Sequence, residues 1–223
     1  MFSNEPAITR SSESILATNK VIRNTYTLLS MTLLFSALMA AVAYQLNWPP
    51  MGIIITLVGF FGLMFLTNAT RNSGWGIVSV FALTGFMGAT IGPVVNVYTS
   101  AFTNGHELVM MAMGGTGVIF LGLSGYALTT RKDFSFMGGF LMIGILVAFL
   151  AGIGAAVFSV PGLSLAVSAA FIMLMGGKIL YDTSALIHGG ETNYIMATVS
   201  LYVSIYNLFL SLLHLLGAFA GER

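Results

Sequence analysis

The chain has 223 residues, of which 57% are hydrophobic and only 7% are charged, and its mean hydropathy is +0.94. A water-soluble domain carries roughly 25% charged residues, so this composition excludes a soluble protein. Eight Lys and Arg against seven Asp and Glu give a formal net charge of +1, which excludes the basic field that nucleic acid requires. The absence of cysteine excludes disulfides, thiolate metal sites and cysteine nucleophiles.

Seven apolar runs follow one another along the chain. Each is close to the length of about 20 residues with which a helix crosses a bilayer core of roughly 30 Å. They cover about 25–46, 51–68, 75–98, 107–128, 137–157, 163–187 and 194–217. The sequence therefore predicts an all-α polytopic membrane protein, with seven transmembrane helices in one domain at residues 25–217.

The two ends of the chain lie outside these runs. Residues 1–24 are polar, mixed in charge and rich in Ser, Thr and Asn, which predicts a flexible tail. They are too long and too mixed in charge to be the start of a signal peptide. Residues 218–223 form a short C-terminal end.

The orientation of the chain is predicted from its basic residues. Lys and Arg occur in the tail and in the second and fourth loops, but not in the first, third and fifth loops: Arg10, Lys20, Arg23, Arg71, Arg131 and Lys132. Because cytoplasmic loops carry an excess of Lys and Arg, we expect a cytoplasmic N-terminus and an external C-terminus. Arg223 on the external side is a minor exception.

Glycines recur at short spacing within the runs. Without Cβ atoms, helix backbones can approach closely, and close packing drives helix association in lipid. No strand precedes these glycines, so they do not form a phosphate-binding loop. We therefore assign a packing role to Gly85, Gly88, Gly92, Gly114, Gly115, Gly117, Gly138, Gly139, Gly152, Gly154, Gly176 and Gly177.

Two enzyme-like or cofactor-like patterns can be set aside. The sequence around Ser124 and His214 resembles the Gly-x-Ser-Gly and His-x-x-Gly-x-x-x-Gly motifs of rhomboid intramembrane proteases. The alternating direction of the spans places the two residues roughly 20 Å apart, whereas a nucleophile and its base need about 3 Å. A retinal protein would carry a lysine on its seventh helix, and residues 194–217 contain none. No catalytic residue is predicted, and we do not expect an enzyme.

The seventh run carries polar residues spaced by four, three, four and three, so that all lie on one face of a helix: Ser200, Ser204, Asn207, Ser211 and His214. Two interpretations stay open. The face forms hydrogen bonds to other helices, or it lines a path for water or ions. Both predict that the seventh helix lies in the centre of the bundle.

Lys178 and Asp182 lie within the sixth run. An ionisable group at membrane depth costs at least roughly 2.5 to 3.5 kcal/mol and usually marks function. Residues four apart share a helix face and can neutralise each other. We therefore expect an ion pair, close to the cytoplasmic end, that serves as a structural site or as part of a gate.

Several motifs together resemble the Bax inhibitor-1 family (transmembrane Bax inhibitor motif), most closely its bacterial YccA-type branch. They are Thr84-Gly85-Phe86-Met87-Gly88, Tyr181-Asp182-Thr183, Tyr194-Ile195 and Ser204-Ile205-Tyr206-Asn207-Leu208-Phe209. The resemblance extends over about residues 20–217. It implies a seven-helix fold whose last helix is surrounded by the other six.

One function of the family does not match this sequence. The resemblance implies that family members that leak calcium or protons use two aspartates, one on the sixth helix and one on the seventh. An arginine on the second helix pairs with this acidic site. Asp182 matches the first aspartate, but Ser204 and Ser200 stand where the family has further aspartates, and Arg71 lies beyond the second run. A two-carboxylate gate is therefore absent, and no metal site is predicted, because calcium needs more than one carboxylate.

Members of the YccA-type branch are associated with modulation of FtsH, a membrane-bound AAA protease. The resemblance therefore implies a non-enzymatic bacterial inner-membrane protein, N-terminus cytoplasmic and C-terminus periplasmic, that modulates membrane-protein quality control by binding FtsH. The tail at residues 1–24 would be a handle for that protease. The alternative is a pH-sensitive calcium or proton leak channel that uses Asp182 and the polar face of the seventh helix. Neither function needs a cofactor.

Overall fold

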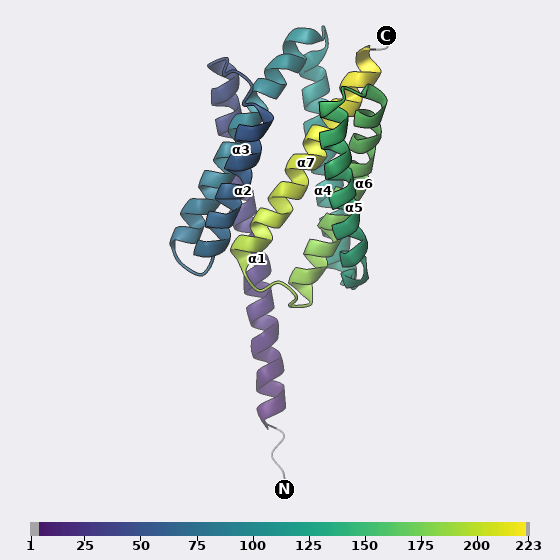
Figure 1. Ribbon diagram of the computed structural model, residues 1–223. Coiled ribbons are helices and arrows are strands. Elements are labelled where there is room, and N and C mark those ends of the chain that lie inside the picture. The colour runs from purple at the N-terminus through teal and green to yellow at the C-terminus, as the bar shows by residue number, and fades with distance from the viewer. Residues whose placement is uncertain (1–4, 222–223) are drawn as a thin grey trace.

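The computed structural model describes the backbone of residues 5–221 and the side chains of residues 18–221. This part of the chain forms seven α-helices and one 3-10 helix (Figure 1). Their bounds are α1 Glu5–Gln45, α2 Ile53–Thr70, α3 Trp75–Ala101, α4 Gly105–Thr130, η1 Ser135–Met137, α5 Gly138–Val157, α6 Pro161–Ile187 and α7 Tyr194–Gly221. Each α-helix includes a stretch that is long and apolar enough to cross a membrane. The fold is an all-α polytopic membrane protein, as the sequence predicted.

The first helix differs most from its expected bounds. The other six begin and end within four residues of the predicted runs, whereas α1 begins at Glu5 instead of near residue 25. The structure thus has a helix over residues 5–24, where a flexible tail was predicted. These residues contain no glycine, and Pro6 stands in the first turn, where proline is tolerated. The part of α1 that can span a membrane begins at Thr18. Residues 1–4, the side chain of Arg10 and Arg223 lie outside the description.

Helix α7 lies in the middle of the bundle. It packs against α1, α2, α3, α4 and α6, and Figure 1 shows it between the α2–α3 side and the α5–α6 side. The central position is confirmed, but α7 is surrounded by five helices and not by six. Helix α5 packs on α6 and η1 at the edge of the bundle, without contact to α7. Among the largest fully buried side chains, many belong to α7, including Leu201, Tyr202 and Leu208.

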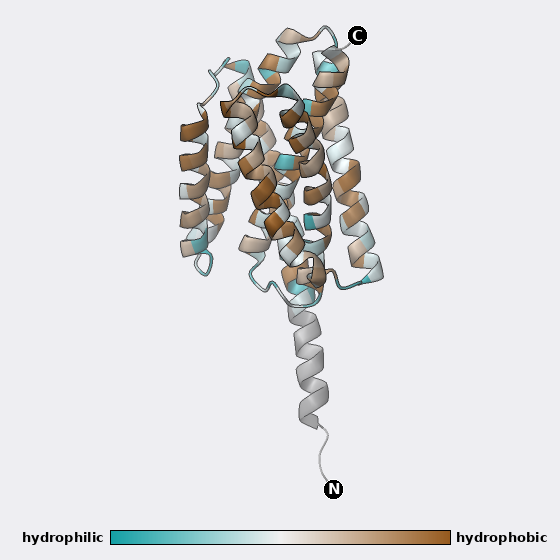
Figure 2. Cartoon of the chain, turned by 45° about the vertical axis from the view of Figure 1, so that its right-hand side comes forward, coloured by the Kyte–Doolittle hydropathy of each residue, from teal (hydrophilic) through white to brown (hydrophobic). Residues whose placement is uncertain are grey.

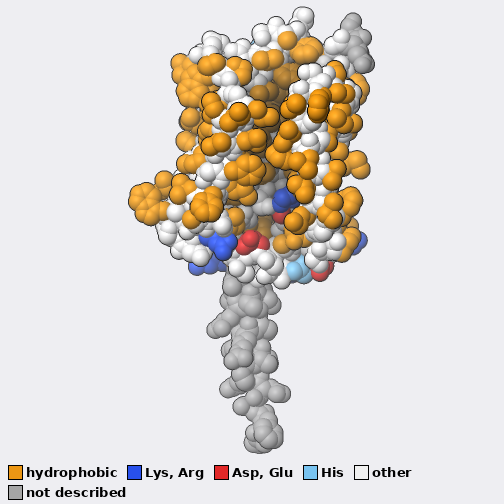
Figure 3. Space-filling view, in the orientation of Figure 1, with side chains coloured by type: hydrophobic (Ala, Val, Ile, Leu, Met, Phe, Trp, Pro, Cys, Tyr) orange, Lys and Arg blue, Asp and Glu red, His pale blue; other side chains and the backbone are white. Residues whose placement is uncertain are grey.

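Charged side chains gather at one end of the bundle. Hydrophobic residues predominate along the helices (Figure 2), and the charged groups visible in Figure 3 concentrate at the end nearer the N-terminus. We call this the basic end, defined by Lys20, Arg23, Arg71, Arg131 and Lys132. The described loops at the opposite end carry no Lys or Arg. This asymmetry matches the distribution that the sequence predicted.

Glycines allow a close contact between helices α1 and α3. A Cβ atom added at Gly88 would overlap the backbone carbonyl of Ser36. One added at Gly92 would lie 2.6 Å from Cβ of Ala43 and 2.7 Å from the carbonyl oxygen of Ala40. Backbone atoms cannot move aside as a flexible side chain can. These glycines therefore set how closely α3 approaches α1.

The other glycines differ in what surrounds them. Contacts at ordinary or slightly short distance would form at Gly115, Gly138, Gly152, Gly176 and Gly177. The packing role predicted from spacing is wrong at four positions, where an added Cβ would meet nothing within 4 Å: Gly114, Gly117, Gly139 and Gly154. Spacing alone did not separate them, because it does not reveal which face of a helix meets a neighbour.

A glycine-to-alanine comparison tests this contact. We expect Gly88→Ala to lower the melting temperature in detergent by several degrees, because overpacking typically costs about 1 to 3 kcal/mol. Gly122→Ala on α4 is the matched control. It has open space around it, and alanine is the better helix former, so the melting temperature should stay the same or rise. Equal effects of the two changes would contradict the close α1–α3 contact.

Candidate functional site

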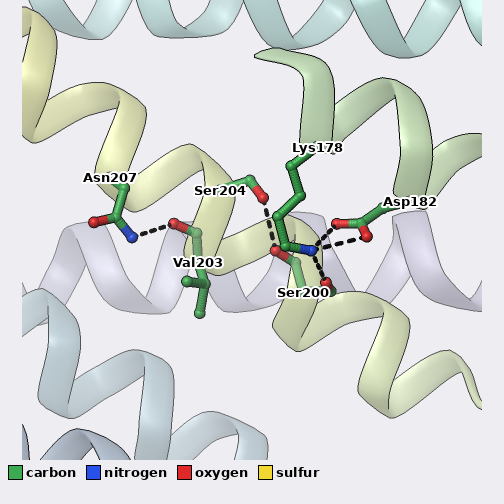
Figure 4. Close-up of polar contacts among 6 residues, drawn as sticks. All are labelled: Lys178, Asp182, Ser200, Val203, Ser204 and Asn207. Carbon is green, nitrogen blue, oxygen red and sulfur yellow. Dashed lines mark hydrogen bonds and ion pairs between the residues drawn. The ribbon is translucent and has the colours of Figure 1, made fainter. Parts of the chain in front are cut away.

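Lys178 and Asp182 form an ion pair on α6, and a third residue from α7 completes it. Nζ of Lys178 donates to the two carboxylate oxygens of Asp182, at 2.9 and 2.8 Å, and to Oγ of Ser200 (Figure 4). A lysine ammonium has three N–H donors, so every donor has an acceptor. The pair is thereby neutral and fully hydrogen-bonded at membrane depth.

The two charged side chains differ in exposure. The Lys178 side chain is 23% exposed and that of Asp182 only 10%. Because helical side chains lean toward the helix N-terminus, Lys178 has to bend back along α6 to reach Asp182. Asp182 stands five residues before the end of α6 at Ile187, near the basic end. The carboxylate is therefore enclosed by protein, and the lysine partly covers it.

The polar face of α7 does not act as one continuous array. Ser200 accepts from Lys178, whereas Oγ of Ser204 donates to the backbone carbonyl of Ser200 at 3.0 Å, and the Asn207 amide donates to that of Val203 at 2.8 Å (Figure 4). Two of the five residues are thus satisfied within their own helix.

Toward the other end of α7, His214 makes the second polar link to α6. Its Nδ1 lies 2.7 Å from Oγ of Ser168. Ser211, one turn before His214, is buried. The hydrogen bonds at Ser200 and His214 both join α7 to α6. They favour the first interpretation of the polar face, in which it forms hydrogen bonds to other helices.

Four consecutive residues on α6 face four different parts of the protein. The ring of Tyr181 packs beside Gly138 at the start of α5, and Asp182 meets Lys178. The hydroxyl of Thr183 lies 3.3 Å from both Tyr26 on α1 and Ser124 on α4. Oγ of Ser184 accepts from the backbone N–H of Phe134 in the α4–α5 loop. This segment joins most of the elements at the basic end.

The arrangement around Ser124 also bears on the protease-like motifs. Ser124 is hydrogen-bonded to Tyr26 and Thr183 near the basic end. His214 is bonded to Ser168, fourteen residues before Asp182 on α6. The two therefore belong to separate hydrogen-bonded groups, as the sequence argument required, and do not form a nucleophile–base pair.

Sequence reasoning did not identify three polar groups that organise α7. The Tyr202 hydroxyl lies 2.6 Å from Oγ of Ser36 and donates to the carbonyl of Thr84 at 3.2 Å. The Tyr206 hydroxyl lies 2.7 Å from Oγ1 of Thr90. A tyrosine in a membrane span needs a hydrogen-bond partner for its hydroxyl. Two tyrosines in the seventh run could therefore have indicated contacts with other helices.

Asn193 is the third. Its side-chain oxygen accepts from the backbone N–H groups of Ile195 and Met196, which caps the N-terminus of α7. Its amide donates to the carbonyl of Arg71 at 3.1 Å and to Oδ1 of Asn72 at 3.0 Å. Asn193 therefore joins the α6–α7 loop to the α2–α3 loop. The signal was an asparagine directly before an apolar run.

The described residues hold no group of three or more His, Asp or Glu that could bind a metal ion. In α6 the one carboxylate, that of Asp182, is paired with a lysine of the same helix. Such a site can hold helices together and can bind or release a proton, but it offers calcium a single carboxylate.

A central helix packed among other helices that can span a membrane, with a buried acid near one end of the bundle, defines a multi-pass membrane protein. The model of the family described as "Inhibitor of apoptosis-promoting Bax1" matches residues 18–221, which is most of the chain. The chain belongs to this family, the Bax inhibitor-1 family.

The chain has relatives in several bacteria. It is 54% identical over 204 residues to "Modulator of FtsH protease YccA" of Escherichia coli, which covers 92% of each chain. It is 52% identical over 202 residues to an uncharacterised protein of Pseudomonas aeruginosa, over 91% of this chain and 90% of the other. An uncharacterised membrane protein of Vibrio cholerae is 42% identical over 217 residues, or 96% and 97% of the two chains.

A double-mutant cycle tests whether the pair is kept for mutual neutralisation. We expect Lys178→Met with Asp182→Leu to melt closer to the parent than either single change does. Removing one partner of a buried pair costs about 3 to 5 kcal/mol, whereas replacing both by apolar groups is often near neutral. The single effects should be smaller here, because Lys178 is partly exposed.

The measurement is thermal unfolding in detergent at neutral pH. Lys132→Met at the basic end is the control, since Lys132 has no ion pair among the described residues, and it should have little effect. Additive losses from the two changes would show that Lys178 and Asp182 do not stabilise each other.

Proposed function

We propose that this protein is a non-enzymatic modulator of membrane-protein quality control in the bacterial inner membrane, acting through the membrane-bound AAA protease FtsH. The observation that carries the proposal is the 54% identity, over 92% of both chains, to a protein named for modulation of that protease. A relative from another Escherichia coli strain, also 54% identical, is named as an inner membrane protein. The N-terminus is cytoplasmic in this proposal, which agrees with the position of the basic end.

The geometry of the site supports a structural role for the buried pair. Both oxygens of Asp182 accept from Lys178, and the third lysine donor is taken by Ser200. A proton or calcium path would need this carboxylate free at least part of the time. A modulator that binds another membrane protein has no such requirement, and a rigid, neutral link between α6 and α7 suits it.

The second candidate is a pH-sensitive leak of calcium or protons. The observation that favours it is the partial exposure of Lys178, at 23%, directly over a nearly enclosed Asp182. If Lys178 moved away, the carboxylate would be left to bind a cation. Ser204 argues against a calcium path, because its hydroxyl is bonded to its own helix where a second acid would be needed.

Binding to FtsH is tested by co-purification. We expect the tagged full-length protein, solubilised from Escherichia coli membranes in mild detergent, to retain FtsH and to slow the degradation of a membrane-protein substrate of FtsH in reconstituted vesicles. An unrelated seven-helix protein with the same tag is the control. No retention together with an unchanged degradation rate would overturn the proposal.

The contribution of the N-terminal segment is tested by a deletion. We expect removal of residues 2–16 to lengthen the lifetime of the protein in cells that contain FtsH, because an ATP-driven protease needs a segment to engage. The melting temperature should not change, since the spanning part of α1 begins at Thr18. An unchanged lifetime would remove this segment from the interaction and leave the rest of the proposal standing.

Ion flux distinguishes the second candidate. In liposomes, we expect the parent to pass calcium no faster than Asp182→Asn, because a single neutralised carboxylate binds calcium weakly. Ser204→Asp should introduce a pH-dependent flux by adding an acid near Asp182. A strong flux in the parent that disappears in Asp182→Asn would establish the leak.

A further inference from the structure

A pocket of about 490 Å³ opens at the basic end, between α1, α4 and α6. The polar part of its wall consists of Thr18 and Asn19 on α1, Arg131 at the end of α4 and His188 at the end of α6. Apolar side chains form the rest, among them Ile22 and Leu128. The pocket thus has a polar, basic part and an apolar part, at the depth where the spanning region of α1 begins.

The charge of the pocket is positive. Arg131 is exposed, and its guanidinium has no ion-pair partner among the described side chains. Lys20 and Arg23 lie on the same turn of α1 as the lining residues. The opposing acid is Asp133 in the α4–α5 loop, whose carboxylate is close enough to His188 for a Coulombic interaction. The backbone N–H of Ser135 lowers the pKa of Asp133, so that this carboxylate is ionised at neutral pH. Arg131 is therefore the basic side chain that lines the pocket, and Lys20 and Arg23 add positive charge on the neighbouring part of α1.

We call the line along which α1 and α4 lie beside each other the seam, and it passes Tyr26 between this pocket and an apolar groove. Their backbones do not pack on each other. Their main link is the contact of Tyr26 with Ser124 and Phe120. Beyond it, an apolar groove of about 430 Å³ opens between the two helices, beginning near Leu33 and Phe120. A helix about 10 Å in diameter, with a pitch of about 5.4 Å, would fill this volume with roughly one turn.

The distance between pocket and groove matches half of a bilayer. Ile22 borders the pocket and Leu33 borders the groove, eleven residues apart on α1. At about 1.5 Å per residue this is roughly 16 Å, and half of a hydrocarbon core is about 15 Å. A lipid whose headgroup lay in the pocket would have the end of its acyl chain at the groove.

We propose that this pocket binds the phosphate of one anionic phospholipid, with an acyl chain lying along the seam between α1 and α4. Arg131 supplies the charge, with donors that suit phosphate oxygens, and the hydroxyl of Thr18 and the amide of Asn19 supply neutral donors. Ile22 and Leu128 contact the start of the chain. The positive charge of the basic residues favours an anionic lipid over a zwitterionic one. Apolar contact along the seam favours a lipid, which has acyl chains, over a free anion.

The test uses the full-length protein in uncharged detergent, with phosphatidylglycerol and phosphatidylcholine of identical acyl chains. Bound lipid is counted by native mass spectrometry, and the melting temperature is followed during the titration. We expect phosphatidylglycerol to bind about fivefold more tightly, the effect of one basic residue near an anionic lipid surface. Glycerol phosphate, which has the phosphate without the chains, should not protect at the same concentration.

Two variants reduce the preference in different ways. Arg131 has a positive φ of 50°, so Arg131→Asn removes the charge with a residue that tolerates this conformation. Thr18→Glu places a negative charge in the pocket wall and serves if the first variant fails to fold. Lys132→Gln is the control, because the Lys132 ammonium lies 5.7 Å from the Tyr126 ring and does not line the pocket.

The expected result is that Arg131→Asn and Thr18→Glu abolish the preference for phosphatidylglycerol while Lys132→Gln keeps it. Equal binding of the two lipids by the parent would overturn the proposal. An equal loss in Lys132→Gln would replace it with a diffuse surface charge, and equal protection by glycerol phosphate would replace it with a site for a free anion.

Discussion

The packing of the bundle depends on how the ammonium of Lys178 is neutralised and hydrogen-bonded within a membrane-spanning helix. Lys178 achieves this with the two oxygens of Asp182 and the hydroxyl of Ser200. The first partner lies on the same helix and the second on α7, so satisfying the charge also positions α7 against α6. The residues after Asp182 extend this effect, because Thr183 reaches α1 and α4 and Ser184 reaches the α4–α5 loop. A short segment of α6 therefore determines how the elements meet at the basic end.

Helix α7 lies in the centre because its polar side chains form hydrogen bonds to several other helices, and its apolar side chains pack against several helices as well. Tyr202 is bonded to Ser36 on α1 and to α3, and Tyr206 to Thr90 on α3. In lipid the hydrophobic effect does not hold helices together, so close packing and such bonds have to do so. The close approach of α3 to α1 at Gly88 supplies the packing, and the tyrosines supply the bonds. Asn193 adds a connection between loops on the two sides of α7.

Much of this architecture could be predicted from the sequence, since the length of apolar runs and the distribution of Lys and Arg are local properties. The spacing of Lys178 and Asp182 likewise predicted their contact. Partners far apart in sequence could not be predicted, because Ser200 and Ser204 look alike on a helical face although one meets α6 and the other its own backbone. For the same reason Gly88 and Gly117 could not be distinguished. The helix at residues 5–24 was missed because polar composition was given more weight than the lack of helix breakers.

The spacing of four between Lys178 and Asp182 also matters while the protein is being made. Chains are synthesised from the N-terminus, so α6 leaves the ribosome before α7, which carries Ser200. A lysine whose counter-charge stood on α7 would have to wait in lipid as an isolated cation. With Asp182 one turn away, α6 carries its own neutralising group and can be inserted as a single neutral segment. The order of biosynthesis thus favours an ion pair within one helix over the same pair divided between two.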